Sequence, residues 1–192
     1  MSVTVITLTG KAGSGKDTAA DYLVKHFGFT KLSWAGPLKA ALASMGFPEP
    51  ANRDDKEQLV PGFDFTWRRA AQMLGTEWGR ALDTNIWTKI IMAQIAAAPA
   101  GSRFVISDTR FENEAAEVRA VGGLVVHLQG RAADLGAAAA HVSEEPVNIQ
   151  DEDHVLNNDS TITWMQIGLE QMMKSLGLEH AYNWPRNVPV AQ

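Results

Sequence analysis

Three glycines and a lysine near the N-terminus form the stretch of sequence that is best suited to hold phosphate. Gly10, Gly15 and Lys16 satisfy the spacing G-x-x-x-x-G-K, with Gly13 and Ser14 between them. Glycine lets the backbone curl until successive N–H groups face phosphate oxygens, and the positive end of a following helix adds to the attraction. A lysine at this position bridges the β- and γ-phosphates. The spacing therefore predicts a nucleotide-binding loop, and the alternative is an ordinary glycine turn.

Asp17 stands where loops of this kind usually carry a serine or threonine that binds Mg²⁺. A carboxylate can bind this ion directly or through water, because Mg²⁺ prefers oxygen ligands and keeps several waters. Thr18 supplies the next hydroxyl and can take the same role. Alternatively, Asp17 is an acidic residue favoured in the first turn of a helix by the helix dipole. We expect Asp17 or Thr18 at the metal, with that alternative open.

A second polar cluster, "SDTRFENE", follows a short apolar run that we expect to be a strand. In an α/β sheet, ligands bind outside the carboxyl ends of the strands. Asp108 is suited to hold Mg²⁺ through water, and the planar fork of Arg110 matches a phosphate at two points. Glu114, one helical turn later, is placed to orient that arginine or to contact a sugar. The alternative is a helix cap at Asp108 with a surface pair between Arg110 and Glu114.

Three other stretches carry weaker signals. Arg68, Gln72 and Thr76 recur every four residues, so they share one polar stripe of a predicted helix, which suits either a phosphate and a base edge or plain solvent. Trp87 is able to stack on a base, although a tryptophan among isoleucines is often core packing. Arg131 lies among small residues and fits a lid arginine that covers the transferring phosphoryl group; the alternative is a surface loop.

The elements that position these residues alternate between strands and helices. Predicted strands lie at 3–8, 29–33, 103–107, 124–129 and 154–158. Predicted helices lie at 16–27, 37–46, 66–82, 86–98, 112–123 and 161–176. This alternation predicts an α/β fold in which a parallel β-sheet is flanked by helices on both faces. We expect one domain over 1–180 with a flap around 47–64 and a lid around 130–145, followed by a tail at 181–192.

Helical periodicity predicts which side of two helices is buried. In the helix after the glycine-rich loop the apolar face holds Ala19, Ala20, Leu23, Val24 and Phe27, and Gly28 ends it. In the helix that begins near Thr66, the predicted buried side holds Trp67, Ala71, Leu74, Trp78 and Ala81.

Composition excludes several classes of protein. The 192 residues suffice for one well-buried domain, the net charge is −5, and there is no cysteine. An acidic chain without a basic run makes stable nucleic-acid binding unexpected. Without cysteine, neither a disulfide nor a thiolate metal site can form. The N-terminus has no apolar signal core, and "VTVITL" is too short to span a membrane, so we expect a cytoplasmic protein.

Taken in order, these stretches resemble the phage deoxynucleoside monophosphate kinases of the T-even type, which have a P-loop. The resemblance covers nearly the whole chain, and SGKDT with its aspartate is that family's own form of the loop. The matching pieces are "SGKDTAAD", "AGPLKAAL", "RRAAQMLGT", "IW", "DTRFENE", "GGLVVHL", "HVSEEP" and "VLNNDS". One departure is the stretch before "WRRAAQ", which is shorter than in the T-even enzyme, so base preference is not carried over.

The resemblance implies transfer of the γ-phosphoryl group of ATP, with Mg²⁺, to a deoxynucleoside 5′-monophosphate. The residues from Gly13 to Thr18 then form the ATP site around Lys16. Asp108, Arg110 and Glu114 lie where the family binds the acceptor. Further acceptor contacts implied by the family are Arg68 or Arg69, Gln72 and Trp87. A phage-encoded enzyme of this kind acts in the host cytoplasm, and a homodimer is compatible with it.

Two other functions stay open at the level of sequence. One is a P-loop kinase of another small molecule, such as dephospho-coenzyme A or a nucleoside, which a screen of acceptors distinguishes. The other is a nucleotide-binding switch or assembly ATPase, for instance in DNA packaging, which hydrolyses ATP without a phosphorylated small product. The acidic charge disfavours the second function.

Overall fold

The protein is described by a computed structural model at residues 3–52, 54–130 and 147–181. Its centre is a five-stranded sheet in the order β2-β3-β1-β4-β5, and every neighbouring pair is parallel. The strands are β1 Thr4–Thr9, β2 Thr30–Leu32, β3 Arg103–Ile106, β4 Leu124–Gly130 and β5 His154–Asn158. The predicted parallel sheet is confirmed.

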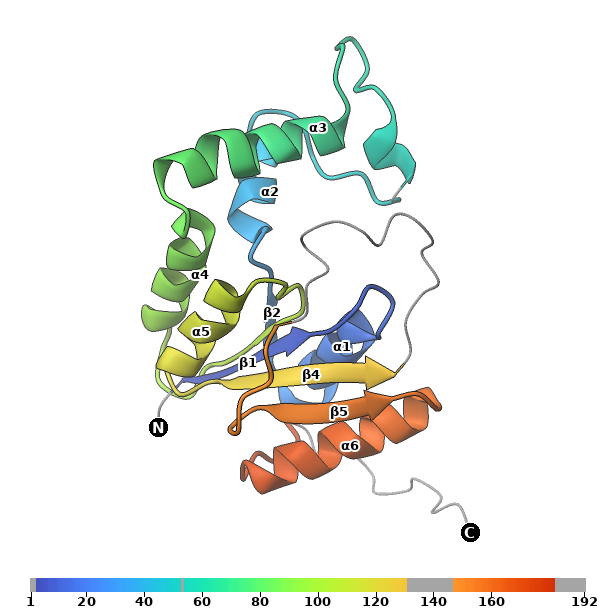
Figure 1. The fold of residues 1–192 in the computed structure, drawn as a ribbon, viewed down its shortest axis with the longest axis vertical. Helices are drawn as coiled ribbons and strands as arrows, with labels where there is room; N and C mark the ends of the chain where they lie inside the picture. The colour runs from blue at the N-terminus through green and yellow to red at the C-terminus, as the bar shows by residue number, and fades with distance from the viewer. Residues whose placement is uncertain (1–2, 53, 131–146, 182–192) are drawn as a thin grey trace.

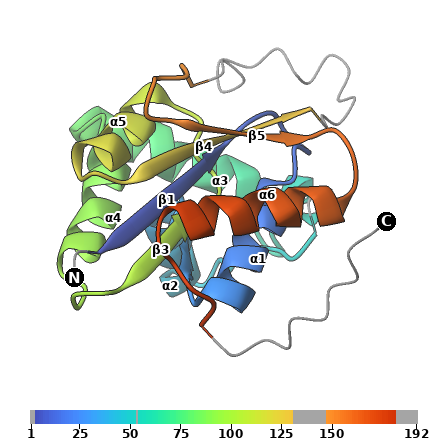
Figure 2. The same cartoon turned by 90° about the horizontal axis from the view of Figure 1, so that it is seen from below.

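Helices connect the strands and cover both faces of the sheet, as predicted (Figures 1 and 2). Figure 2 shows α1 and α6 on one face and α5 on the other. The helices are α1 Lys16–Phe27, α2 Gly36–Ser44, α3 Trp67–Gln72, α4 Ile86–Ala96, α5 Glu112–Ala120 and α6 Ile162–Ser175. Two further elements are the 3₁₀ helix η1 Asp54–Glu57 and the π-helix η2 Met73–Arg80.

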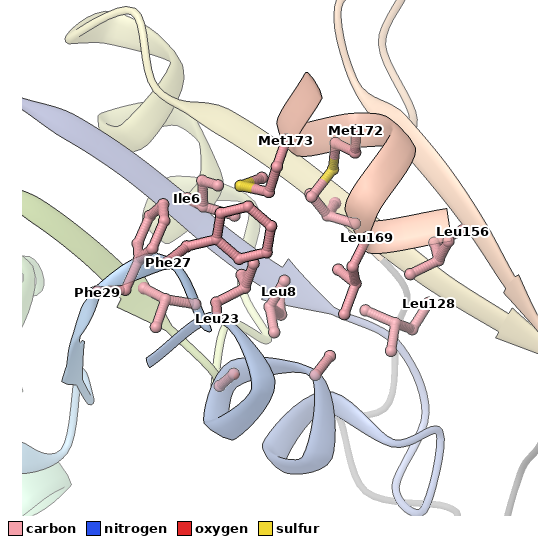
Figure 3. Packing of buried hydrophobic residues seen from close by; sticks show 14 of the residues in the cluster. Ile6, Leu8, Leu23, Phe27, Phe29, Leu128, Leu156, Leu169, Met172 and Met173 are labelled. Carbon is pink, nitrogen blue, oxygen red and sulfur yellow. The ribbon is translucent and has the colours of Figure 1, made fainter. Parts of the chain in front are cut away.

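The largest core cluster lies between the sheet and the α1–α6 layer (Figure 3). Ile6 and Leu8 of β1 point into it, which follows from the alternation of side chains along a strand. They pack against Leu23 and Phe27 of α1 and against Leu169 of α6, all nearly fully buried. The strand that carries the glycine-rich loop is therefore fixed by packing immediately before the loop begins.

A second cluster covers the opposite face. Val5 of β1 and Phe104 of β3 pack there against Ile91 and Ile95 of α4 and Val118 of α5. Burial of β1 on both faces explains why its sequence is almost continuously apolar or β-branched.

Helix α1 has the predicted bounds and the predicted end. Gly28 adopts φ 68°, and its N–H donates to the carbonyl of Leu23. The expectation that Val24 is buried was wrong, because this side chain lies at the edge of the apolar face and is 37% exposed.

The helix predicted at 66–82 changes type in its middle. After Gln72 the backbone forms η2, in which each turn takes up more residues than in an α-helix. Gly75 and Gly79 are buried there, whereas Trp78 is 53% exposed and Ala81 is exposed. The predicted burial of Trp78 and Ala81 was wrong, because a spacing of 3.6 residues does not describe a π-helix.

The segment predicted as a flap, 47–64, packs against α3. Phe47, Phe63 and Phe65 form a cluster of rings with centroids 5.2–5.4 Å apart. The indole N–H of Trp67 donates to the carbonyl of Phe47 at 3.1 Å. Figure 1 shows this segment with α2 and α3 above the sheet, on the side away from α6.

Two predicted segments fall almost entirely outside the described residues. The lid around 130–145, with Arg131, has only Gly130 within them, and the tail at 181–192 only Ala181. Among the helices of the described ranges, none combines the length and the apolarity needed to cross a membrane.

Candidate functional site

The glycine-rich loop joins the end of β1 to the start of α1, as predicted. Gly10, Gly13 and Gly15 all have positive φ angles, of 141°, 77° and 94°. The loop curls around Lys16, whose Nζ donates to the carbonyl oxygens of Gly10 at 2.6 Å and Lys11 at 2.8 Å. The first N–H groups of α1 lack intrahelical acceptors, as at every helix start. The arrangement is suited to bind an anion at the N-terminal end of α1.

The two ends of the loop pack so tightly that only glycine fits. A Cβ on Gly10 would collide with the carbonyl oxygen of Leu128 in β4. A Cβ on Gly15 would lie 2.5 Å from Nδ2 of Asn158 at the end of β5. The loop, which follows β1, therefore also packs against the carboxyl ends of β4 and β5.

Asn158 was not among the residues singled out from the sequence. Its side chain is buried, and Nδ2 donates to the carbonyl oxygen of Ser14 at 2.8 Å. Ser14 itself is 2% exposed. The only sequence signal was the paired asparagine in "VLNNDS", which periodicity cannot assign to a contact 144 residues away.

Asp17 lies in the first turn of α1 and points toward β2 and β3. Oδ1 accepts from Ser107 Oγ at 2.9 Å and pairs with Lys31 Nζ at 3.0 Å. Burial raises the pKa of Asp17, but hydrogen bonds from Lys31 and Ser107, with the charges of Lys31 and Lys16, hold it below its ordinary value. The carboxylate is therefore ionised at neutral pH. Thr18 is exposed at the same end of the helix.

Asp108 holds the turn that leads into α2. Its carboxylate accepts from Ser33 Oγ at 2.6 Å and from the backbone N–H of Trp34 at 3.0 Å. Neither contact was expected from the sequence. The alternative considered there was that Asp108 caps the helix that follows it. A role for Asp108 in binding Mg²⁺ stays a prediction, and its carboxylate already holds these donors.

Glu114, and not Asp108, caps α5. Its Oε2 accepts from the backbone N–H groups of Arg110 at 2.8 Å and Phe111 at 3.1 Å. Burial raises the pKa of Glu114, and these two hydrogen bonds oppose the rise. Arg110 is exposed, and its guanidinium has no acidic partner within the described part of the chain. The side-chain pair between Arg110 and Glu114 is therefore absent there, and Glu114 fixes the backbone that carries the arginine.

A buried polar contact ties the segment after β3 to β1 and to the turn before α2. The indole N–H of Trp34 donates to Thr109 Oγ1 at 2.8 Å, and Thr109 Oγ1 also contacts Thr7 Oγ1. All three residues are buried. This contact helps to fix the backbone from which Arg110 projects.

The other predicted acceptor residues lie on α3, η2 and α4. Arg68 forms an ion pair with Glu57 of η1, and Arg69, Gln72 and Thr76 are exposed. Trp87 packs against Gly79, and its indole N–H donates to the carbonyl of Gly75 at 2.9 Å. This geometry agrees with core packing, and a base contact for Trp87 stays a prediction.

No group of three or more His, Cys, Asp or Glu side chains among residues 3–52, 54–130 and 147–181 is arranged to hold a metal ion. Carboxylate and hydroxyl oxygens do lie at the start of α1, on Asp17 and Thr18. These oxygens fit an ion that receives its other ligands from nucleotide phosphates and water.

Comparison with known proteins gives a consistent result. A family model described as "Deoxynucleotide monophosphate kinase" matches residues 53–167. A protein of Acanthamoeba polyphaga mimivirus, provisionally named a deoxynucleotide monophosphate kinase, is 33% identical over 177 residues, which cover 82% of this chain and 90% of the relative. The uncharacterised protein ORF77 of Ictalurid herpesvirus 1 is 29% identical over 164 residues, covering 83% of this chain and 65% of the relative.

Solved structures share the fold. TT1252 from Thermus thermophilus superposes with a TM-score of 0.55 at 20% identity, over 92% of this chain and 99% of its own. A sugar kinase from Janibacter sp. HTCC2649 superposes with a TM-score of 0.50 at 14% identity, over 92% of this chain and 95% of its own.

Proposed function

The chain belongs to the deoxynucleotide monophosphate kinase family, and on this premise we propose that residues 10–18 hold ATP while Arg110 and its neighbours hold the deoxynucleoside monophosphate. The protein is a phosphotransferase that phosphorylates deoxynucleoside monophosphates. Transfer of the γ-phosphoryl group of ATP to the acceptor phosphate gives ADP and the deoxynucleoside diphosphate.

The observation that carries this assignment is the contact between the loop helix and the residue after β3. Ser107 Oγ donates to Asp17 Oδ1 at 2.9 Å, so the first turn of α1 lies against the segment that continues to Arg110. β1 and β3 are also parallel neighbours, so both segments leave the same edge of the sheet. A donor at the loop and an acceptor at Arg110 would then lie side by side.

The chemistry of the transfer matches these side chains. The acceptor is already a phosphate anion, so no strong general base is required. The enzyme has to hold two highly charged groups in line and reduce their mutual repulsion. Lys16 supplies one cation at the loop, and Arg110 supplies a fork of donors that fits the acceptor phosphate. Glu114 supports Arg110 by holding its backbone N–H at 2.8 Å.

Asp17 and Thr18 are the residues that would hold Mg²⁺ beside ATP. The ion, when bound with ATP, neutralises part of the charge on its phosphates. Asp17 suits this role because its ionised state is favoured and its side chain is 80% exposed. Asp108 is assigned to positioning the turn before α2, since Ser33 and Trp34 already donate to its carboxylate.

Arg68 or Arg69 and Gln72 complete the acceptor side in this proposal, together with Trp87, and Arg131 covers the transferring group. Arg68 would exchange its partner Glu57 for the acceptor. The assignments of Arg68 or Arg69, Gln72 and Trp87 follow the family resemblance, and that of Arg131 follows its place among small residues in the predicted lid.

The test is incubation of the protein with Mg-ATP and each common deoxynucleoside or nucleoside monophosphate, with products separated by chromatography. We expect ADP and a deoxynucleoside diphosphate in equal amounts. Phosphorylation of a different class of acceptor, or ATP hydrolysis without a phosphorylated product, contradicts the proposal.

A further inference from the structure

Asn158 is the final residue of β5 and lies under the glycine-rich loop. Its amide donates to the carbonyl oxygen of Ser14 at 2.8 Å, and the contact is buried. Its Nδ2 also lies 2.5 Å from the place where a Cβ on Gly15 would stand. The sulfur of Met165 in α6 lies 3.6 Å from the same place. The loop therefore rests on a floor made of Asn158 and the first turn of α6.

The direction of this hydrogen bond determines where one N–H of the loop points. A trans peptide is planar, so the C=O of Ser14 and the N–H of Gly15 point in opposite directions. Because the Ser14 carbonyl is held toward Asn158, the Gly15 N–H is directed away from the buried floor. Among the described residues, no backbone carbonyl accepts from this N–H.

We propose that Asn158 is a positioning residue of the ATP site, which holds the Ser14–Gly15 peptide so that its N–H faces the phosphates of the donor. The inference rests on the proposed ATP site at residues 10–18. Asn158 touches no reacting atom and acts through the loop. Its loss therefore weakens the binding of ATP and leaves the binding of the acceptor nearly unchanged.

The substitution Asn158→Asp tests this with little change of shape. A carboxylate cannot donate to the Ser14 carbonyl, so the peptide loses its partner and faces a second acceptor. Asn157→Asp is the matched control, because it adds the same charge one residue earlier on the same strand. Asn157 is exposed, and consecutive side chains of a strand point to opposite faces.

The measurements are the dissociation constant of Mg-ATP by calorimetry, and kcat with the KM values of ATP and the monophosphate. For Asn158→Asp we expect the dissociation constant and the KM of ATP to rise roughly ten- to hundredfold, since loss of a buried hydrogen bond costs that much in affinity. The KM of the monophosphate should change less than about threefold, and Asn157→Asp should resemble the wild type.

Equal affinity of Asn158→Asp and Asn157→Asp for Mg-ATP overturns the inference. So does an equal rise in the KM values of ATP and monophosphate, which indicates a general structural role. If Asn158→Asp does not fold, Asn158→Ala takes its place with Asn157→Ala as control. Failure of both Asn158 variants to fold also overturns a local role at the ATP site.

Failure of the proposed function gives a different result. A wild-type protein that binds Mg-ATP but phosphorylates no deoxynucleoside monophosphate refutes the proposed function. The dissociation constants of the two aspartate variants still decide the role of Asn158 in that case.

Discussion

Ser107 and Asp17 are joined by a hydrogen bond of 2.9 Å between residues 90 positions apart in the chain. The bond connects the residue after β3 to the first turn of the helix that follows the glycine-rich loop. Asp17 also pairs with Lys31 in β2, so three adjacent strands contribute to one edge of the site. Asp17 therefore lies where the proposed donor and acceptor segments meet.

Lys16→Ala should remove turnover without unfolding the protein. Lys16 Nζ is the cation enclosed by the loop, and loss of a preorganised charge at the transferring group lowers kcat by roughly a hundredfold or more. Lys25→Ala is the control, because it removes an exposed lysine from the last turn of α1, away from the loop. Steady-state assays of ADP release measure both variants, and near wild-type turnover in Lys16→Ala contradicts the assignment.

Arg110→Ala should raise the KM of the monophosphate or lower kcat by roughly a hundredfold, with the affinity for ATP almost unchanged. Arg110→Lys keeps the charge and removes the fork, so it should restore only part of the loss. Kinetics with the two substrates varied separately distinguish these effects. Unchanged acceptor kinetics in Arg110→Ala would mean that this exposed arginine is a surface residue.

Asp17→Asn should raise the Mg²⁺ concentration for half-maximal rate by about tenfold. The amide oxygen can still accept from Ser107, so the contact between α1 and the end of β3 is kept while the charge is lost. Asp21→Asn serves as control, because Asp21 shares Lys31 but lies one turn further along α1. Mg²⁺ titrations at saturating ATP should show the rise in Asp17→Asn alone. Equal behaviour of the two variants favours an aspartate that serves only the helix dipole, and a rise in Thr18→Val assigns the ion to Thr18.

Asp153 should make stability depend on pH in acid. It accepts two hydrogen bonds from Arg119, at 2.9 and 2.6 Å, and pairs with His127 at 2.8 Å. Burial raises the pKa of Asp153. Hydrogen bonds from Arg119, the N–H of Gln150 and His127 outweigh this effect and lower the pKa to about 2. Because the folded pKa is depressed, the stabilisation is present above the unfolded pKa and is lost as the pH falls toward 2.

Urea unfolding at several pH values measures this effect. The wild type should lose on the order of 2 kcal/mol between about pH 5 and pH 2 that Asp153→Asn does not lose. At neutral pH Asp153→Asn should be less stable by about 3 kcal/mol, since Arg119 loses a buried partner. Asp151→Asn, exposed in the same turn, should follow the wild type. Parallel curves for the wild type and Asp153→Asn would refute this account.

Gly79→Ala should destabilise the contact between η2 and α4. A Cβ at this position would lie 2.5 Å from the Trp87 ring, so the helices must separate at a cost of about 1–3 kcal/mol. Gly36→Ala is the control, since nothing lies within 4 Å of its added Cβ. Thermal and urea unfolding give both values. Equal stability of the two variants would show that Trp87 is not tightly packed against η2.

Local signals predicted most of the fold. The loop, α1 and its end at Gly28 follow from glycines and periodicity within about 20 neighbouring residues, and the structure has them where expected. The π-helix was not predictable, because Gly75 and Gly79 are buried against Leu38 and Trp87, which belong to other helices. Its hydrogen-bond pattern leaves no mark in the spacing of apolar residues.

The residues of the candidate site also divide into those with partners nearby in the sequence and those with distant partners. Lys16 was predicted from the local motif at the start of α1, and its partners Gly10 and Lys11 lie only six and five positions away. Asn158 and Ser107 were missed, because their partners lie 144 and 90 positions away and are brought close only by the strand order. The turn held by Asp108 is likewise formed by residues 75 positions away.

The most direct test of the account is the product formed from Mg-ATP and a panel of monophosphates, with Lys16→Ala measured in parallel. We expect one deoxynucleoside diphosphate for each ADP released by the wild type, and almost none from Lys16→Ala. ADP released without a diphosphate product, or equal product from the lysine variant, would contradict it.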